Sequence, residues 1–160
     1  MPRSATPPSD EELDFGILLG LAYLTFVEEL MERMKASGFD DLGPSHGYVF
    51  RALADGPMTL SALAANLDMT TQGAAKIVED MERGSYVTRT PDPNDRRARH
   101  IELAPRGRKA LANARRVHAS YERRLAKRLG ADAVRTTRDV LSAAIAKGDL
   151  EPSNRLMRPV

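Results

Sequence analysis

The chain has 160 residues, which predicts a single domain, residues 1–160, with enough chain to bury a hydrophobic core. It contains no cysteine, so disulfides, thiolate metal sites and thiol redox sensing are excluded. The formal net charge is only +2, but acids outnumber bases before residue 41 and bases dominate residues 86–128. This asymmetry indicates a polyanionic partner for the second half of the chain.

The N-terminal segment is polar and proline-rich, with no visible secretory signal. The most apolar run, residues 15–27, is shorter than the roughly 20 residues that a membrane span needs. We therefore expect a cytoplasmic protein with no membrane partner.

Apolar residues at spacings of three and four predict a long first helix over residues 10–37. Ser9 or Asp10 can cap it, and Gly38 can end it. Apolar side chains cover most of its circumference, and a helix of that kind must be buried nearly all round. In a chain this small a second subunit is the natural cover, so this helix predicts a homodimer.

Two short helices and a tight turn follow. Residues 44–54 are expected to form a second helix, and Thr59 can cap a short third one. The turn at residues 68–69 leads straight into a fourth helix, which begins at about Thr70 and reads TTQGAAKIVEDME. Short helices joined in this way match the helix-turn-helix pattern, in which the second helix of the pair reads DNA.

The exposed front of the fourth helix carries candidate DNA contacts: Thr70, Thr71, Gln72, Gly73 and Lys76. Gln72 could pair with adenine, and the threonines could contact phosphate or a thymine methyl group. The alternative for Thr70 and Thr71 is helix capping alone. Gly73 either permits close approach to DNA or is merely a weak helix position.

After the fourth helix the pattern changes to period two. Residues 86–88 extend, residues 92–95 turn and residues 98–103 extend again, which predicts a β-hairpin. Its tip and returning strand carry further candidate DNA contacts: Asp95, Arg96, Arg97 and Arg99. A polar helix beside an arginine-tipped hairpin suits two adjacent DNA grooves, the wide major and the narrow minor. The alternative is that these arginines are only solvated hairpin charges.

Pro105 is well placed at the first position of a fifth helix that runs to about residue 129, where Gly130 breaks it. The side chains expected on its buried side are Leu111, Val117, Tyr121, Leu125 and Leu129. Its arginines, Arg106 among them, are expected to form a mostly solvated face. A last helix is expected over residues 132–147.

This order of elements resembles the MarR (multiple antibiotic resistance regulator) family of winged-helix repressors over roughly residues 10–147. The specific segments are LSALAANLDMTTQGAAKIVEDME and, most diagnostic, YVTRTPDPNDRRARHIELAPRGRKAL. The resemblance implies a mainly α fold with a small β-wing. A winged helix-turn-helix lobe at residues 44–103 would lie between dimerisation helices at residues 10–37 and 105–147. Three positions depart from the family pattern: Asp68 and Ser85 stand where glycine is expected, and Ala104 where a threonine cap is common.

The resemblance also implies roles for particular residues. Arg97 would enter the minor groove with Asp95 orienting it, and the operator would be a palindrome of double-stranded DNA. An effector pocket at the dimer interface would be lined by Tyr23, Phe26, His46, Phe50, His118 and Tyr121, although apolar residues at helical spacing are usually plain core. His46, His100 and His118 lack metal-ligand spacing, so we expect no metal and no cofactor.

The sequence therefore favours a homodimeric, sequence-specific DNA-binding transcriptional regulator, a repressor released by a small aromatic or phenolic ligand. One rival is an enzyme, but the chain has no nucleophile elbow, phosphate loop or ligand cluster. The other is a helical dimerisation or ligand-binding protein that has lost DNA binding, which the intact Asp95-Arg96-Arg97 tip argues against.

Overall fold

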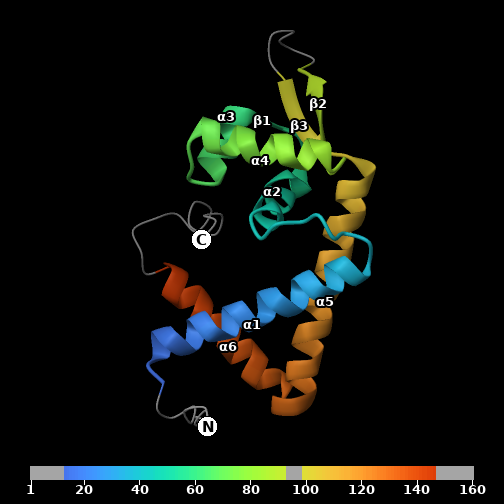
Figure 1. Ribbon diagram of the computed structural model, residues 1–160. Coiled ribbons are helices and arrows are strands. Elements are labelled where there is room, and N and C mark those ends of the chain that lie inside the picture. Colours follow the sequence, from blue (N-terminus) through green and yellow to red (C-terminus); the bar gives the residue numbers. More distant parts are fainter. Residues whose placement is uncertain (1–12, 93–98, 147–160) are drawn as a thin grey trace, which may run out of the picture.

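The structure, a computed structural model, describes residues 13–92 and 99–146. Its elements are α1 (Phe15–Ala36), α2 (His46–Ala52), the 3-10 turn η2 (Leu53–Asp55), β1 (Met58–Thr59), α3 (Leu60–Asn66), α4 (Thr71–Arg83), β2 (Val87–Pro91), β3 (Arg99–Leu103), α5 (Pro105–Leu129) and α6 (Ala131–Ala146). The elements from α2 to β3 form a compact lobe at one end, and α5 leads from it to α1 and α6 at the other (Figure 1). This mainly helical arrangement with a small sheet confirms the predicted winged-helix fold.

The sheet is antiparallel, with strand order β1-β3-β2. Val87 pairs with Leu103 at the base of the β2–β3 hairpin and Pro91 pairs with Arg99 further out. The hairpin was predicted, but β1 was not. A two-residue strand is too short to show alternation, and Met58 is recruited by pairing with Ile101 of β3.

The turns of the helix-turn-helix follow the sequence chemistry. Thr59 Oγ1 accepts a hydrogen bond from the Ala62 N–H at 3.2 Å, which confirms the predicted cap of α3. Asp68 adopts φ 50°, so the turn keeps the left-handed conformation without the expected glycine. At the end of α4 the left-handed residue is Ser85, at φ 59°. Gly84 is needed for another reason, because a Cβ there would lie 2.7 Å from the Tyr86 ring.

The predicted start of the first helix is wrong. Asp14 has an extended backbone, with ψ 140°, and α1 begins at Phe15 rather than at residue 10. Ser9 and Asp10 lie outside the described residues. Apolar spacing shows that a helix is present but does not mark its first residue. The first N–H groups have no partner within the helix, so the start depends on local capping instead.

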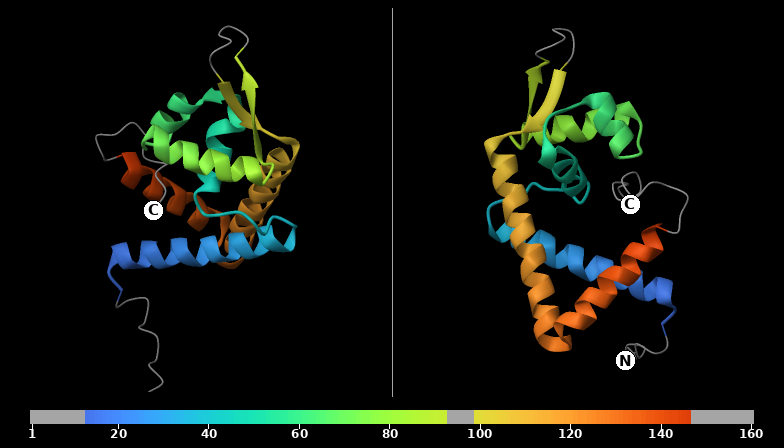
Figure 2. Two further views of the ribbon diagram at one scale, coloured as in Figure 1. Left: turned by 45° about the horizontal axis from the view of Figure 1, so that its top comes forward. Right: turned by 180° about the vertical axis from the view of Figure 1, so that it is seen from behind.

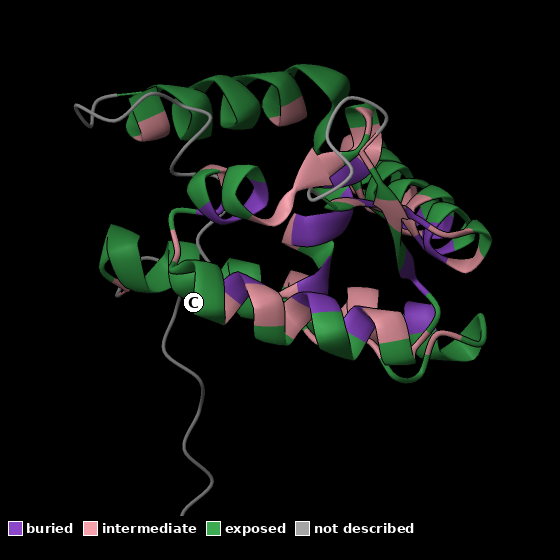
Figure 3. Ribbon diagram, turned by 90° about the horizontal axis from the view of Figure 1, so that it is seen from above, coloured by how far each residue is buried: buried purple, intermediate pink, exposed green. Residues whose placement is uncertain are grey.

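The core is concentrated in the lobe and at its junction with α5, and the described part of α6 has no buried residue (Figure 3). The prediction that Leu129 is buried is wrong for the single chain: 64% of it is exposed. It is the last residue of α5, beyond the part of that helix which packs on the lobe. No helix within residues 13–92 and 99–146 is both long and apolar enough to cross a membrane.

Aromatic packing and a charged pair help to hold α1 on α5. Phe26 packs edge-on against Tyr121, with ring centroids 4.9 Å apart. Arg124 donates to both carboxylate oxygens of Glu29 at 2.5 Å, and this hydrogen bonding is the main reason why the pKa of Glu29 is lowered. The dimerisation helices predicted from the sequence are therefore anchored to each other within one chain.

Arg106 is not a solvated charge, which corrects the expectation for this position. Its guanidinium donates to the Gly84 carbonyl at 2.7 Å and to Asp41 at 3.1 Å, and it lies 4.5 Å from the centre of the buried Tyr86 ring. The Tyr86 hydroxyl donates to the same Asp41 carboxylate. This cluster ties the loop after α1 to the end of α4 and the start of β2, because each element contributes one partner.

Replacing Tyr86 by Phe is expected to lower the free energy of unfolding by about 1–2 kcal/mol, because the hydrogen bond to an ionised carboxylate is lost. Desolvation raises the pKa of Asp41, but hydrogen bonds from Tyr86 and its own backbone, with the charge of Arg106, outweigh it and leave that pKa lowered. The difference between the two proteins should thus be complete above about pH 4 and shrink as the pH falls through the lowered value. Urea unfolding at pH 7 and pH 3 measures it; an equal difference at both would contradict this role of Asp41.

Candidate functional site

The two faces of α4 differ sharply. Ala74, Val78 and Met81 are buried in the lobe. Gln72 and Lys76, one turn apart, are exposed on the other side. The N-terminal half of α4 therefore presents a polar, exposed surface, as a helix that enters the major groove must.

The start of α4 separates the two roles that the sequence left open for its threonines. Thr70 is the N-cap: its hydroxyl accepts from the Gly73 N–H at 3.1 Å. Thr71 is the first helical residue and is exposed, so its hydroxyl is not used in that cap. A Cβ on Gly73 would lie 3.2 Å from Thr70 Oγ1 and 3.3 Å from Met69 Cε. Glycine at position 73 thus permits a tight cap.

The wing projects from the same end of the lobe as α4, as both views of Figure 2 show. Arg89 of β2 is joined to Glu82 of α4 at 3.0 Å, which fixes the hairpin against the helix. His100 of β3 contacts Asp92 at 3.2 Å. Arg99 is exposed at the first described position of the returning strand. The predicted contacts Asp95, Arg96 and Arg97 lie outside the described residues.

A pocket of about 390 Å³ lies between α1, α2 and α5. Its lining includes five of the six residues that were predicted to form one site: Tyr23, Phe26, His46, Phe50 and His118. Tyr121, the remaining residue of that group, does not line it but packs edge-on against Phe26, which does. That these residues bind a ligand stays a prediction.

The pocket wall is mostly apolar, with a few polar groups. The hydroxyls of Tyr23 and Tyr48 lie 3.3 Å apart, and desolvation, followed by the contact with Tyr23, raises the pKa of Tyr48 to about 12. Desolvation also lowers the pKa of His118, which favours its neutral form. Arg51 is the cationic residue of the lining, and it is exposed. A neutral aromatic group therefore fits this pocket better than a buried charge.

His46 joins this pocket to α4. It is 6% exposed, its Nδ1 accepts from the Gly43 N–H at 3.1 Å, and its Nε2 lies 3.0 Å from Asp80 Oδ2. The pKa of Asp80 is lowered, first by the hydrogen bond from Arg83 and also by His46. Asp80 was not predicted from the sequence, because nothing in the chain order indicates which carboxylate meets His46.

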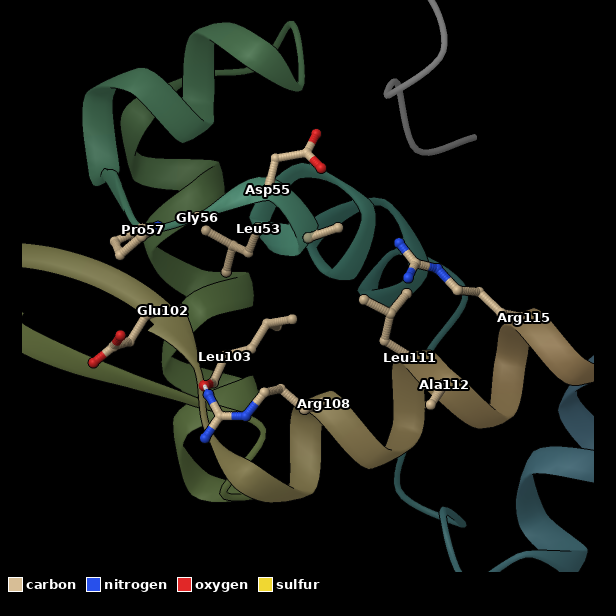
Figure 4. Close-up of a pocket in the computed structure, with 11 residues that line it drawn as sticks. Leu53, Asp55, Gly56, Pro57, Glu102, Leu103, Arg108, Leu111, Ala112 and Arg115 are labelled. Carbon is tan, nitrogen blue, oxygen red and sulfur yellow. Dashed lines mark hydrogen bonds between the residues drawn. The ribbon is translucent and has the colours of Figure 1, made fainter.

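A second hollow, of about 410 Å³, lies beside the first half of α5 (Figure 4). The turn before β1, the end of β3 and the first half of α5 form its walls. Leu53, Leu103 and Leu111 give it an apolar floor, and Arg108 at its edge donates to the Leu103 carbonyl. This hollow was not predicted from the sequence. Within the described ranges, no group of three or more His, Cys, Asp or Glu residues could hold a metal ion.

Comparison with known proteins identifies the lobe. The sequence model of the MarR family matches residues 40–98, from the loop before α2 to the wing. The segment that carries α2, the helix-turn-helix and the wing is thus of the MarR type. The regulator resemblance expected from the sequence is thereby confirmed, and with it a role in transcription regulation and DNA binding. No curated protein matches the sequence.

Solved structures share this fold over most of the chain. The transcriptional repressor CouR bound to a 23-mer DNA duplex is 28% identical, with 85% of this chain and 92% of CouR covered and a TM-score of 0.64. CouR from Rhodococcus jostii RHA1 bound to p-coumaroyl-CoA gives 21% identity, 86% and 96% coverage and a TM-score of 0.63. RV1404 from Mycobacterium tuberculosis gives 18% identity, 89% and 100% coverage and a TM-score of 0.71.

Proposed function

We propose that this MarR-family regulator is a homodimeric repressor that binds a palindromic operator and is released by a small aromatic or phenolic ligand. The observation that carries the proposal is the polar, exposed N-terminal half of α4 beside an outward-projecting hairpin, at the end of the lobe away from α1 and α6. Similarity to CouR, a repressor bound to DNA in its structure, supports the repressor role.

The exposed surface of α1 supports the dimer. Every residue from 15 to 25 is exposed, including Phe15 at 62%, Ile17 at 54% and Leu24 at 62%. On the described part of α6, Val140 and Leu141 are exposed as well. A contiguous apolar surface of this kind marks an interface. We infer that a second copy covers it through the N- and C-terminal helices, which leaves the two lobes free for DNA.

The mostly apolar pocket beside α2 supports the effector. It combines aromatic walls with a few hydroxyl groups, a composition typical of small-molecule sites. A similar protein, CouR, has been seen with p-coumaroyl-CoA bound. Screening phenols and small aromatic acids for release of this protein from a bound duplex tests the assignment; a pocket that binds none of them would contradict it.

Replacing Gln72 by Ala is expected to relax base preference at one position of each half-site, at a cost of about 1–3 kcal/mol on the preferred sequence, with little change in salt dependence. Lys76→Ala is the contrasting variant. If Lys76 contacts phosphate, its loss weakens all sequences alike and lowers the slope of log K against log salt by about one unit. Titrations on matched and mismatched duplexes separate the two. If the base preference of Gln72→Ala is unchanged, α4 does not recognise bases through this residue.

A further inference from the structure

The pocket and the recognition helix α4 share one buried residue. His46 lines the pocket and at the same time holds Asp80 of α4 at 3.0 Å. We propose that His46 is the positioning residue through which occupancy of the pocket moves α4 and so changes DNA affinity. This inference rests on the proposed function, because it names the route by which the ligand of that same pocket acts.

Both ring nitrogens of His46 have a hydrogen-bond partner. Nδ1 accepts from the Gly43 N–H, so the proton of the neutral ring resides on Nε2, which donates to Asp80 Oδ2. The His46 N–H in turn donates to the Gly43 carbonyl at 3.1 Å. Gly43 also lines the pocket. A ligand that displaces either Gly43 or the imidazole therefore acts on the same hydrogen-bonded unit.

Because of the hydrogen bond to Asp80, we expect the His46 ring to adopt two discrete positions and not a continuous range of them. The His46 side chain is 8% exposed, so a ring turned away from Asp80 leaves a buried N–H without its partner until another is found. Asp80 lies about two turns along α4 from Gln72, and a helix of that length moves as a unit. A shift at Asp80 is thus carried to the surface that faces DNA.

Phe50 provides a second, less directional contact, which leads from the pocket to the residue before β2. It lines the pocket and packs edge-on against Tyr86, with ring centroids 5.6 Å apart. Apolar packing can adapt by small displacements, whereas a hydrogen bond is lost when its geometry fails. The His46–Asp80 contact is therefore the part of the route that substitution can switch off.

The test uses the full-length protein, and a larger side chain inside the pocket takes the place of a bound ligand. Ala114 lines the pocket from α5, so Ala114→Phe places a ring there without any added ligand. DNA affinity is measured for Ala114→Phe, Asp80→Ala and the double variant. We expect Ala114→Phe to change DNA affinity by about fivefold or more in the parent protein and by much less once Asp80 is Ala. Ala114→Leu repeats the cycle if the larger side chain prevents folding.

Two matched variants distinguish the loss of the His46–Asp80 hydrogen bond from a general disturbance of α4. Arg83→Ala removes the other ion pair of Asp80, at 2.7 Å, and should leave the effect of Ala114→Phe unchanged. Asp80→Asn keeps an acceptor for His46 Nε2 and should restore that effect. Equal effects of Ala114→Phe with and without Asp80, or no effect in the parent, would overturn the inference. Failure of the proposed function is a different result, since the parent protein would then show no sequence-specific DNA binding at all.

Discussion

Replacing Arg97 by Ala is expected to weaken DNA binding strongly, by about 1–3 kcal/mol for each well-seated contact, with two such contacts in a dimer. The role of Arg97 comes from the family resemblance, and the described strands β2 and β3 place the hairpin at the end of the lobe that α4 shares. Narrow A·T-rich minor grooves concentrate negative potential and attract arginine. Loss of a phosphate neutralisation by Arg97 would also lower the salt slope by about one unit per site.

A salt titration on one duplex measures both effects of Arg97→Ala. Arg128→Ala is the matched control, because Arg128 is an exposed arginine near the C-terminal end of α5, far along that helix from the lobe. It should leave affinity and slope close to the parent values. Parent-like affinity and slope for Arg97→Ala would mean that the wing does not read DNA in this protein.

Replacing Leu24 by Asp is expected to dissociate the dimer at micromolar concentration. Leu24 is 62% exposed in the single chain, within the stretch of α1 where every residue from 15 to 25 is exposed. A carboxylate buried there at a dimer interface would cost several kcal/mol in each subunit unless it found a partner. DNA binding should fall with the dimer, because each subunit alone can occupy only one half-site.

Sedimentation of Leu24→Asp measures the assembly, and a duplex titration measures the consequence. Ala65→Asp, which introduces the same group on the exposed side of α3, should sediment like the parent protein. A parent protein that is a stable monomer at micromolar concentration, or a Leu24→Asp variant that remains dimeric, would contradict an interface built on α1.

The local elements of this fold could be predicted from the sequence because their signals are local. The caps at Thr59 and Thr70, the left-handed turn at Asp68 and the β2–β3 hairpin each depend on residues a few positions apart. The start of α1 could not be predicted, because apolar spacing gives the period of a helix and not the residue at which it begins.

Contacts between distant segments account for what the sequence missed. Arg106 meets Asp41 across 65 positions, so its expected role as a solvated charge was wrong. His46 and Asp80 likewise come from different helices, and neither has a neighbour in the sequence that indicates the other. The aromatic residues of the pocket could be grouped only through the family resemblance, and one of them, Tyr121, packs on Phe26 without lining the pocket.

Selection of bound sequences from random duplexes shows whether this protein reads DNA through α4 as a symmetric dimer. A symmetric dimer places two copies of α4 in successive major grooves about 34 Å apart. The selected sequences should therefore share an imperfect palindrome whose half-sites are centred about 10 base pairs apart, with A·T-rich flanks where the wings reach. Selected sequences without two-fold symmetry, or no enrichment over the starting pool, would contradict a dimeric regulator that reads DNA through α4.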